Sequence, residues 1–487
     1  MSGRDEVREL PEPLCFIGGE WRPGGGEVMP VLDPATGEVL CDLVTASGAT
    51  VDAAVAAARA AQPAWAATPA TARARVLLEI AAGLTRHADE IAPVITIDNG
   101  KSLADARGEI QRAVDHLESA ATAPALLHGY GSQGIATGID ASVLREPLGV
   151  CAVVAPFNFP IMTGLIYHAW ALACGNAVVL KPSEQAPLAA TLFARIATEA
   201  GLPPGVFNVV HGGRDVVEAL TDHPDVASIS LVGSSATARA VYTRAANKGK
   251  RAHAAGGARN FLVAMPDADM DGTAAGVVAS VFGMAGQRCL SSSVLVAVGD
   301  VYDRLLGDVI DRTRALTVGS GFDPASDVTP LISQAAVDGL GGTLSAAVDA
   351  GARVLLEPGA VPAQGFFSAP AIAEIDGTDS PLIQRETFGP LLAVLRAADL
   401  DEALALCNAS PFGNAASIFT ASGAAARTFA LGADVGNIGV NIGVAAPAGQ
   451  FAFGGRKESF FGTVHSQGQE AVAFYTDPKS VTVRWPS

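Results

Sequence analysis

The chain of 487 residues is 49% hydrophobic and carries a formal net charge of −17. This length exceeds a single compact core, so we expect two or three domains of a packed α/β protein. The acidic balance excludes nucleic acid as an expected partner, because no basic stripe is available to displace counterions from phosphates, and we attribute the acidity to solubility.

The N-terminal residues 1–11 lack the apolar region of a secretory signal. No apolar run in the sequence reaches the about 20 residues that span a bilayer. We therefore expect no membrane partner and a cytoplasmic location.

The first part of the chain is predicted to form short strands and then helices. Residues 16–45 combine apolar runs with turn residues, which is typical of short strands. From about residue 50, apolar residues recur at three- and four-residue spacing, and Thr68-Pro69 indicates the N-cap and first residue of a helix. A further helix is predicted over residues 102–121. Arg112 lies on it and, from this pattern alone, is an ordinary solvated charge.

Residues 126–148 differ in composition, because glycines are interleaved with β-forming residues. This pattern predicts an extended hairpin that leaves the domain and serves oligomerisation, with a plain surface loop as the alternative. The chain also closes with an extended segment at residues 481–486.

An alternating pattern of strands and helices starts at Gly149. Buried strands are predicted at residues 149–155, 177–180, 206–210 and 229–232. Their alternation with helices of about 10–15 residues implies parallel pairing with right-handed crossovers, a doubly wound sheet. Ligands bind such sheets at the carboxyl ends of the strands, where Gly233 falls. A second α/β region follows Gly256-Gly257, with strands predicted at residues 261–264, 294–298 and 416–419.

Cys289 lies in the string Gly286-Gln287-Arg288-Cys289, directly after an apolar, helix-like segment. Thiolates rather than thiols attack electrophiles, and a neighbouring guanidinium favours the thiolate. Cys289 is therefore a candidate nucleophile, with a small buried hydrophobic residue as the alternative. The six cysteines lie far apart without a CxxC pair, so we expect neither a metal site nor a disulfide framework.

Five short strings occur in a fixed order along the chain. Residues 156–160 read PFNFP, 180–184 LKPSE, 232–234 VGS, 286–289 GQRC and 386–390 ETFGP. Each string is weak alone, but the ordered set makes the chain similar to the aldehyde dehydrogenase superfamily over nearly its whole length. The resemblance implies an aldehyde dehydrogenase-like α/β fold of two doubly wound domains, one NAD-binding and one catalytic, with a small β oligomerisation arm.

The same resemblance implies the domain bounds. Residues 1–125 and 148–256 would form the NAD-binding domain, and residues 257–471 the catalytic domain. Residues 126–147 and 472–487 would form the oligomerisation arm, which completes a neighbour's sheet in a homodimer or homotetramer. The sequence does not choose between these two assemblies.

The resemblance also implies the catalytic roles. Cys289 resembles the nucleophile that adds to the aldehyde carbonyl and gives a thiohemiacetal. Asn158 would donate its side-chain amide, beside the Cys289 backbone N–H, to the developing oxyanion, and such a donor contributes about 3–4 kcal/mol of barrier lowering. An Asn in a turn is otherwise a common turn former.

The cofactor NAD would be held by residues from both regions. By resemblance these are Ala155, Phe157, Lys181, Glu184, Gly233, Ser234, Glu386 and Phe388. Lys181 and Glu184 would hold the adenosine ribose, and the carboxylate would repel a 2′-phosphate, which favours NAD over NADP. Gly233 and Ser234 would lie against the pyrophosphate at a helix start. Glu386 would bind the nicotinamide ribose; outside this family it would be interpreted as surface charge.

One expected residue is missing. Hydrolytic members of the family carry a Glu just before a Leu-Gly-Gly, where it activates water. Residues 253–260 here read HAAGGARN, and we assign Ala254 to the Glu position. Without that base the thioester should hydrolyse slowly, whereas a thiol acceptor needs less help. This absence is typical of the CoA-acylating methylmalonate-semialdehyde dehydrogenase branch.

Further strings resemble that branch. They are GKR at residues 249–251, GGARN at 256–260, MPDAD at 265–269, and FYT and VRWP near the C-terminus. In the branch, two arginines at positions matching Arg112 and Arg288 hold the substrate carboxylate, which a guanidinium fork suits. The segment 442–456 departs from the branch, with Arg456 in place of a usual Trp. The identity of the aldehyde and the site of the CoA adenine therefore stay open.

The resulting hypothesis is an NAD-dependent, CoA-acylating oxidoreductase with a small-molecule semialdehyde substrate. It would oxidise methylmalonate or malonate semialdehyde through a Cys289 thioester and release propionyl- or acetyl-CoA with loss of carbon dioxide. One alternative is an aldehyde dehydrogenase for a different specialised aldehyde. Another is a catalytically retired member kept as a binding protein, against which the intact Cys289, Asn158, Lys181 and Glu386 argue.

Overall fold

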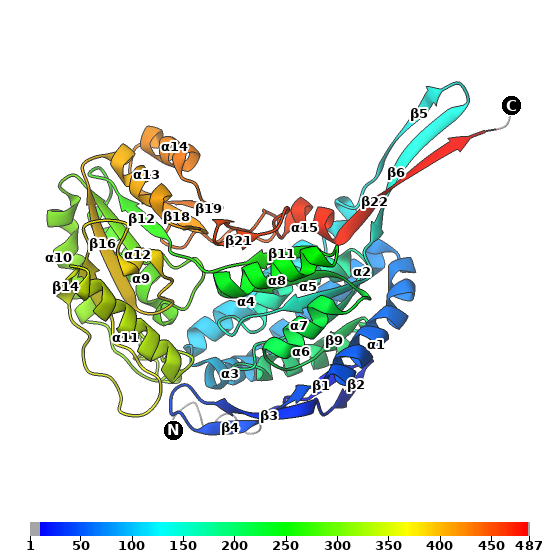
Figure 1. Ribbon diagram of the computed structural model, residues 1–487, viewed down its shortest axis with the longest axis horizontal. Helices are drawn as coiled ribbons and strands as arrows, with labels where there is room; N and C mark the ends of the chain where they lie inside the picture. The colour runs from blue at the N-terminus through cyan, green and yellow to red at the C-terminus, as the bar shows by residue number, and fades with distance from the viewer. Residues whose placement is uncertain (1–9, 486–487) are drawn as a thin grey trace.

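The computed structural model describes residues 10–485. The chain forms two α/β bodies, each built on its own sheet, and a three-stranded arm that extends away from them (Figure 1). Residues 1–9, in the predicted first domain, and residues 486–487, in the predicted arm, lie outside the described part.

The first sheet has eight strands in the order β2-β1-β9-β8-β7-β10-β11-β21. Its bounds are β1 (Cys15–Ile17), β2 (Glu20–Arg22), β7 (Val150–Val154), β8 (Ala177–Lys181), β9 (Phe207–Val209), β10 (Val226–Val232), β11 (Arg251–Ala255) and β21 (Phe460–Phe461). Strands β7 to β11 pair in parallel, as predicted. The edge strands β2 and β21 pair antiparallel with β1 and β11, and β1 pairs antiparallel with β9.

Helices cover both faces of this sheet. They are α1 (Gly48–Ala67), α2 (Ala70–Arg86), α3 (Ala88–Asn99), α4 (Leu103–Ala120), α5 (Met162–Ala173), α6 (Leu188–Glu199), α7 (Arg214–Asp222), α8 (Ser235–Asn247) and α15 (Gly468–Tyr475). Alternate residues of β7 join two different cores: Cys151 and Val153 pack with α2 to α6, whereas Ala152 and Val154 pack with α1, α7 and α8. This follows from the two-residue period of a strand and explains why β7 is apolar throughout.

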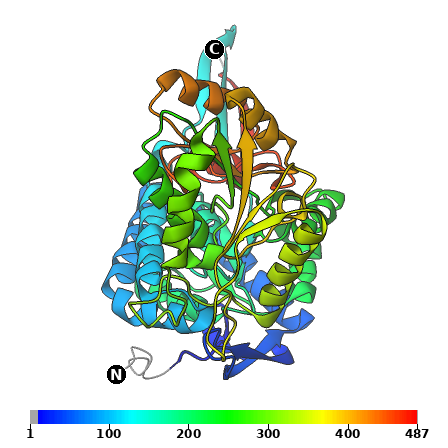
Figure 2. The same ribbon diagram turned by 90° about the vertical axis from the view of Figure 1, so that its left-hand side faces the viewer.

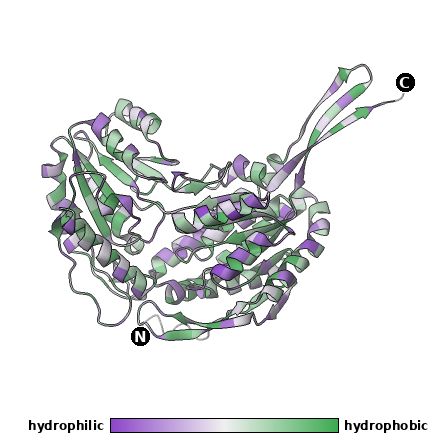
Figure 3. Cartoon of the chain, viewed as in Figure 1, coloured by the Kyte–Doolittle hydropathy of each residue, from purple (hydrophilic) through white to green (hydrophobic). Residues whose placement is uncertain are grey.

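The second sheet has seven strands in the order β14-β15-β16-β13-β12-β18-β19. Its strands are β12 (Phe261–Ala264), β13 (Val294–Val298), β14 (Arg353–Leu356), β15 (Ala371–Glu374), β16 (Leu391–Ala397), β18 (Ala415–Phe419) and β19 (Asn437–Val440). Its helices are α9 (Met270–Phe282), α10 (Val301–Arg314), α11 (Gln334–Asp349), α12 (Pro381–Gln384), α13 (Leu400–Ala409) and α14 (Gly423–Gly432). Turned by 90°, the molecule shows α9 and α11 on opposite sides of this sheet (Figure 2). The strands are mostly apolar and the outer helices carry polar stripes (Figure 3), as a sheet buried on both faces requires.

Smaller elements complete the bodies. They are the ribbon β3 (Gly25–Leu32) and β4 (Val39–Ala46), the pair β17 (Phe412–Gly413) and β20 (Arg456–Lys457), and the 3₁₀ turns η2 (Ala123–Ala125) and η3 (Gly283–Gly286). Strand β21 falls within residues 257–471, the range expected for the catalytic domain, yet it pairs with β11 of the first sheet. The predicted domain bounds stay a prediction.

The hairpin predicted at residues 126–148 is confirmed and forms the arm. Strands β5 (Tyr130–Ala136) and β6 (Ile139–Pro147) pair antiparallel, and the C-terminal β22 (Thr476–Arg484) pairs with the other edge of β6. Residues far apart in the sequence therefore share one small sheet, which stands clear of both bodies (Figure 1).

One helix start differs from its prediction. Thr68 is the C-cap of α1, and its hydroxyl donates to the carbonyl oxygen of Ala64 at 3.0 Å. Pro69 is the N-cap of α2, which begins at Ala70. The prediction was one residue early because Thr68 caps the preceding helix instead. Within residues 10–485, no helix is both long and apolar enough to cross a membrane.

Candidate active site

Cys289 follows a tightly bent turn at the end of α9. Met284 and Ala285 both have φ of 51°, a conformation that non-glycine residues seldom adopt. At Gly286 a Cβ atom would lie 2.3 Å from the carbonyl oxygen of Gly389, so the turn needs glycine there. The turn that carries Cys289 is therefore packed directly against the segment 386–389.

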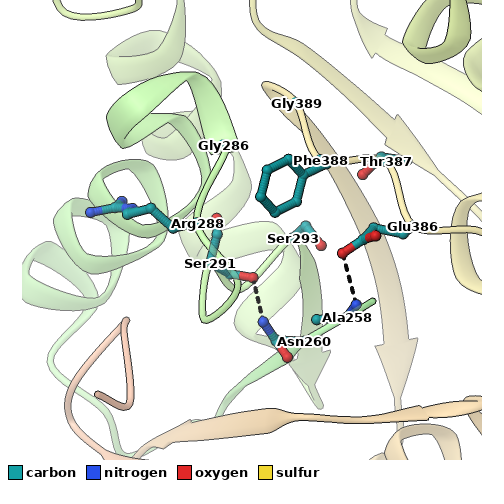
Figure 4. A pocket seen from close by; sticks show the side chains of 10 residues that line it. All are labelled: Ala258, Asn260, Gly286, Arg288, Ser291, Ser293, Glu386, Thr387, Phe388 and Gly389. Carbon is teal, nitrogen blue, oxygen red and sulfur yellow. Dashed lines mark hydrogen bonds between the residues drawn. The ribbon is translucent and has the colours of Figure 1, made fainter. Parts of the chain in front are cut away.

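Two buried amides hold the backbone of Cys289. The side chain of Asn260 donates to the Cys289 carbonyl oxygen at 2.9 Å, and that of Asn414 donates to the same oxygen at 2.7 Å. Asn260 also donates to the carbonyl oxygen of Ser291 at 2.9 Å (Figure 4). Neither asparagine has a predicted role: Asn260 ends the string GGARN, and no sequence pattern marks Asn414.

Asn158 reaches the same turn from the first body. It follows β7, is buried, and donates its side-chain amide to the carbonyl oxygen of Gln287 at 2.9 Å. A primary amide has two N–H donors, so one is left for a ligand. Asn158, which follows a strand of the first sheet, thus contacts Gln287, a residue only two positions before Cys289.

The Cys289 thiol is partly shielded from solvent. Burial raises its pKa to about 11, and the neighbouring Glu386 adds to the increase, while nearby backbone N–H groups and Arg288 act in the opposite direction. The predicted effect of Arg288 has the expected sign, but burial outweighs it. The resting thiol is therefore protonated near neutral pH.

A small open cavity lies between the Cys289 turn and the segment 386–389 (Figure 4). Glu386 accepts a hydrogen bond from the Ala258 N–H at 2.8 Å, and burial raises the pKa of its carboxyl to about 7. A Cβ atom at Gly257 would lie 2.7 Å from the Glu386 carboxylate, so glycine leaves this wall open. Phe388 has φ of 35° and meets the Phe157 ring edge-on, with 5.9 Å between centroids.

A second set of predicted residues lies at the carboxyl edge of the first sheet. The buried Lys181 ammonium donates to Glu184 at 3.1 Å and to the Gly212 carbonyl oxygen at 2.7 Å. Ala155, at the end of β7, donates its N–H to the Lys181 carbonyl oxygen at 2.9 Å. Burial lowers the pKa of Lys181, which the Glu184 carboxylate opposes.

The start of α8 lies at the same edge. Ser234 is its N-cap and accepts a hydrogen bond from the Thr237 N–H at 3.3 Å, directly after Gly233. The exposed first turn of α8 offers backbone N–H groups and the positive end of a helix dipole, an arrangement that suits a phosphate.

The two predicted carboxylate ligands hold different carbonyl groups. Arg112 donates to the Pro447 oxygen at 3.2 Å, and Arg288 donates to the Ser280 oxygen at 3.1 Å. The Arg288 side chain is directed away from Glu386 (Figure 4). Its Nε is buried without a partner among residues 10–485.

The loop of residues 443–449 is held by contacts at both of its ends. The Gly443 carbonyl oxygen accepts the Ser292 hydroxyl at 2.9 Å, and a Cβ atom at Gly449 would lie 2.6 Å from the Ser119 hydroxyl on α4. Arg456, one departure from the branch pattern, instead pairs with Asp434 at 3.1 Å and is exposed. Residues 443–449 thus contact Arg112 through the Pro447 carbonyl oxygen and Ser292 through the Gly443 carbonyl oxygen.

The model of the aldehyde dehydrogenase family matches residues 21–481. The chain belongs to the aldehyde dehydrogenase family. Malonate-semialdehyde dehydrogenase 1 of Geobacillus thermodenitrificans is 41% identical over 477 residues, 96% of this chain and 98% of that protein. The methylmalonate-semialdehyde dehydrogenase DddC of Oceanimonas doudoroffii is 40% identical with a TM-score of 0.95, covering 97% of this chain and 98% of that chain. A Sinorhizobium meliloti protein to which the same activity is attributed, solved with NAD, is 37% identical with a TM-score of 0.95, covering 97% and 98%.

These comparisons confirm the family and the aldehyde dehydrogenase fold predicted from the sequence. The structure places Ala254, which was assigned to the Glu position of the hydrolytic family members, in strand β11. Ala254 is buried on the α8 face of the sheet, in the core that contains Leu231. Ala255 pairs with Val232, and Val232 packs, as Cys289 does, against the core on the opposite face.

The β11 residue on the same side of the sheet as Cys289 is therefore Ala255, and the assignment to Ala254 was one residue early. Strand alternation decides this, because adjacent residues of β11 point to opposite faces. Since Ala255 is also an alanine, the face of β11 toward Cys289 still carries no carboxylate at this point.

Proposed function

We propose that this aldehyde dehydrogenase oxidises malonate or methylmalonate semialdehyde with NAD and passes the acyl group to coenzyme A. One observation carries the proposal: Cys289 and Asn158 converge on one turn, while the strand face opposite them presents Ala255 where hydrolysis needs a carboxylate. The malonate- and methylmalonate-semialdehyde dehydrogenases among the relatives support the substrate class.

The acylation step uses groups from both bodies. The Cys289 sulfur bonds to the aldehyde carbon as the thiol proton leaves, and the carbonyl oxygen becomes an oxyanion. The free N–H of the Asn158 amide and the backbone N–H of Cys289 would stabilise that oxyanion. Water is kept out in part by the apolar core around the thiol, which is also why the thiol stays protonated at rest.

The residues at the sheet edge and in the cavity fit NAD. The exposed start of α8 suits its pyrophosphate, and the open wall at Gly257 beside Glu386 suits its nicotinamide ribose. When bound, NAD would supply the hydride acceptor for oxidation of the thiohemiacetal to a thioester. Glu184, already held by Lys181, would accept from the ribose hydroxyls and repel a 2′-phosphate, which selects NAD over NADP.

The substrate carboxylate would be held by Arg112 and by the free Nε of Arg288. After hydride transfer, the carbon–carbon bond to this carboxylate breaks and carbon dioxide leaves. The electron pair passes into the thioester as an enolate, whose α-carbon then takes a proton from solvent. The CoA thiolate then attacks the thioester carbon and Cys289 departs as the thiolate. The products are acetyl-CoA from malonate semialdehyde and propionyl-CoA from methylmalonate semialdehyde.

The arm supports an oligomeric enzyme. The outer edges of β5 and β22 have no strand partner within residues 10–485, and free edges of this kind pair readily with another chain. We infer a homodimer or homotetramer in which each arm extends the sheet of a neighbour.

The proposal is tested by following NADH formation from malonate or methylmalonate semialdehyde with and without CoA. We expect a burst of one NADH per site without CoA and sustained turnover once CoA is added. Sustained turnover without CoA would disprove the acylating assignment. A burst with propanal but none with either semialdehyde would keep the chemistry and reject the substrate.

A further inference from the structure

A buried ion pair lies directly beneath the Asn158 turn. The Lys101 ammonium donates to Glu109 at 2.6 Å and to the backbone carbonyl oxygen of Asn158 at 2.6 Å, and it lies 4.3 Å from the centre of the Phe159 ring. The side chains of Lys101 and Glu109 are 1% and 0% exposed. Lys101 precedes α4 and Glu109 lies within it, so both come from outside the turn that they contact.

Glu109 holds the other end of the same turn. Its second carboxylate oxygen accepts the backbone N–H of Ile161 at 2.9 Å and of Met162 at 3.1 Å. Without Glu109 these N–H groups at the start of α5 would lack a partner, because the N-cap residue of α5 provides no side-chain cap. A carboxylate at this position also suits the helix dipole.

The turn is thereby fixed on three sides. Lys101 holds the Asn158 carbonyl, Glu109 holds the start of α5, and the Asn158 amide reaches the Gln287 carbonyl oxygen at 2.9 Å. Asn99, at the end of α3, adds a hydrogen bond from its side chain to the Phe157 carbonyl oxygen at 2.8 Å. The direction of the Asn158 side chain is thus set by residues that do not line the cavity beside Cys289.

We propose that the Lys101–Glu109 pair is the positioning element of the oxyanion site. The pair holds the backbone of Asn158 so that the free N–H of the Asn158 side-chain amide points to the carbonyl oxygen of an aldehyde bound at Cys289. The proposal rests on the proposed function only in taking Asn158 as the oxyanion donor. A buried ion pair is not required for packing, because apolar residues of similar size often replace one without loss of stability. The positioning role therefore predicts a catalytic defect in a protein that stays folded.

The test combines Lys101→Met/Glu109→Gln with Asn158→Ala in a double-mutant cycle. The amide oxygen introduced by Glu109→Gln keeps an acceptor for the start of α5, so folding is preserved. The readouts are the NADH burst rate with propanal and NAD, the KM for NAD, the rate of Cys289 alkylation by iodoacetamide, and the Tm. A burst with propanal needs neither CoA nor a carboxylated substrate, so the outcome is independent of the proposed acyl acceptor and semialdehyde.

We expect the burst rate of Lys101→Met/Glu109→Gln to fall about 10- to 100-fold, the cost of misplacing a catalytic group by about 1 Å. The alkylation rate and the KM for NAD should stay within about twofold, because neither uses the oxyanion donor. In the Asn158→Ala background the pair's substitution should cause no further loss, since its effect runs through Asn158.

Two results would overturn the proposal: an equal loss in the Asn158→Ala background, or a parallel loss of alkylation and burst rates. If the double substitution does not fold, Glu109→Gln alone enters the same cycle. The control is Asp98→Asn, since Asp98 is another buried carboxylate of this helical layer and accepts the Leu188 N–H at 2.8 Å at the start of α6. It should change the Tm but not the burst rate.

Discussion

The thiol of Cys289, the proposed nucleophile, lies in a buried environment that favours its less reactive, protonated form. Burial raises the pKa of its thiol to about 11, so only a small fraction is thiolate at pH 7. The two asparagines that hold its carbonyl oxygen fix the backbone rather than the sulfur. The resting thiol is therefore positioned but protonated, and oxidants, which react with the thiolate, should attack it slowly.

The two neighbouring alanines of β11 offer a matched pair of substitutions. Ala255→Glu should install a carboxylate on the Cys289 face, and general-base catalysis of this kind contributes about 10²- to 10⁴-fold. We expect NADH turnover without CoA to rise by at least about 10²-fold. The measurement is steady-state NADH formation in the absence of CoA.

Ala254→Glu is the control, because its side chain would enter the apolar core under α8. It should lower the Tm through an unpaired buried charge and leave CoA-independent turnover unchanged. If Ala254→Glu rather than Ala255→Glu gained hydrolysis, our assignment of the two faces of β11 would be wrong.

Helix α4 carries both a proposed substrate ligand and its control. Arg112→Ala should reduce kcat/KM for a carboxylated semialdehyde about 10- to 100-fold, since hydrogen bonds to charged groups contribute about 1.5–3 kcal/mol. Propanal has no carboxylate, so its kcat/KM should change little. Arg107→Ala removes a charge from the same helix that pairs at the surface with Asp89 at 3.2 Å, and it should affect neither substrate. Equal losses with both aldehydes for Arg112→Ala would show that the residue supports the fold instead.

Elements with strong local patterns were predictable from the sequence. The strand predicted at residues 294–298 is β13, and the helix predicted at 102–121 is α4 (Leu103–Ala120). Hydrophobic periodicity records burial directly, and burial is what these elements need. The phase of β11 was not predictable in this way, because its three central residues are buried although they belong to both faces of the sheet. Only the neighbouring strands reveal which face each residue takes.

The candidate site was predictable only where short strings had a known family pattern. Cys289, Asn158 and Glu386 lie in such strings. In the fold, Asn158 contacts the turn that carries Cys289, and Glu386 lines the cavity beside that turn. Lys101 and Asn414 lie outside them. Their contacts join residues 57 and 125 positions apart in the chain, and no local pattern encodes such a pairing.

At the scale of the whole molecule, the candidate site lies at the junction of the two bodies. The Cys289 turn, the cavity and the segment 386–389 belong to the second body, and Asn158 and the α8 start belong to the first. All of these groups come from a single chain. An isolated protomer should therefore keep the acylation chemistry, and the arm is free to serve assembly.

The arm exposes apolar side chains whose contact with water is unfavourable in a monomer. Tyr130, Ile135 and Leu144 are 77%, 54% and 49% exposed on a small sheet with two free edges. Replacing all three by Ser should remove the apolar contact with a neighbour and lower the molar mass measured by light scattering to that of a smaller species. The NADH burst per protomer should persist, because no proposed catalytic group lies on the arm.

The matched control replaces Leu431 and Val348, which are 78% and 44% exposed on helices of the second body, by Ser. That variant should keep the mass of the unmodified protein. An unchanged mass for the arm variant would mean that the arm does not hold the assembly. A loss of burst along with mass would mean that a neighbouring protomer supports the site, since the arm of β5, β6 and β22 stands far from the second body in its own chain (Figure 1).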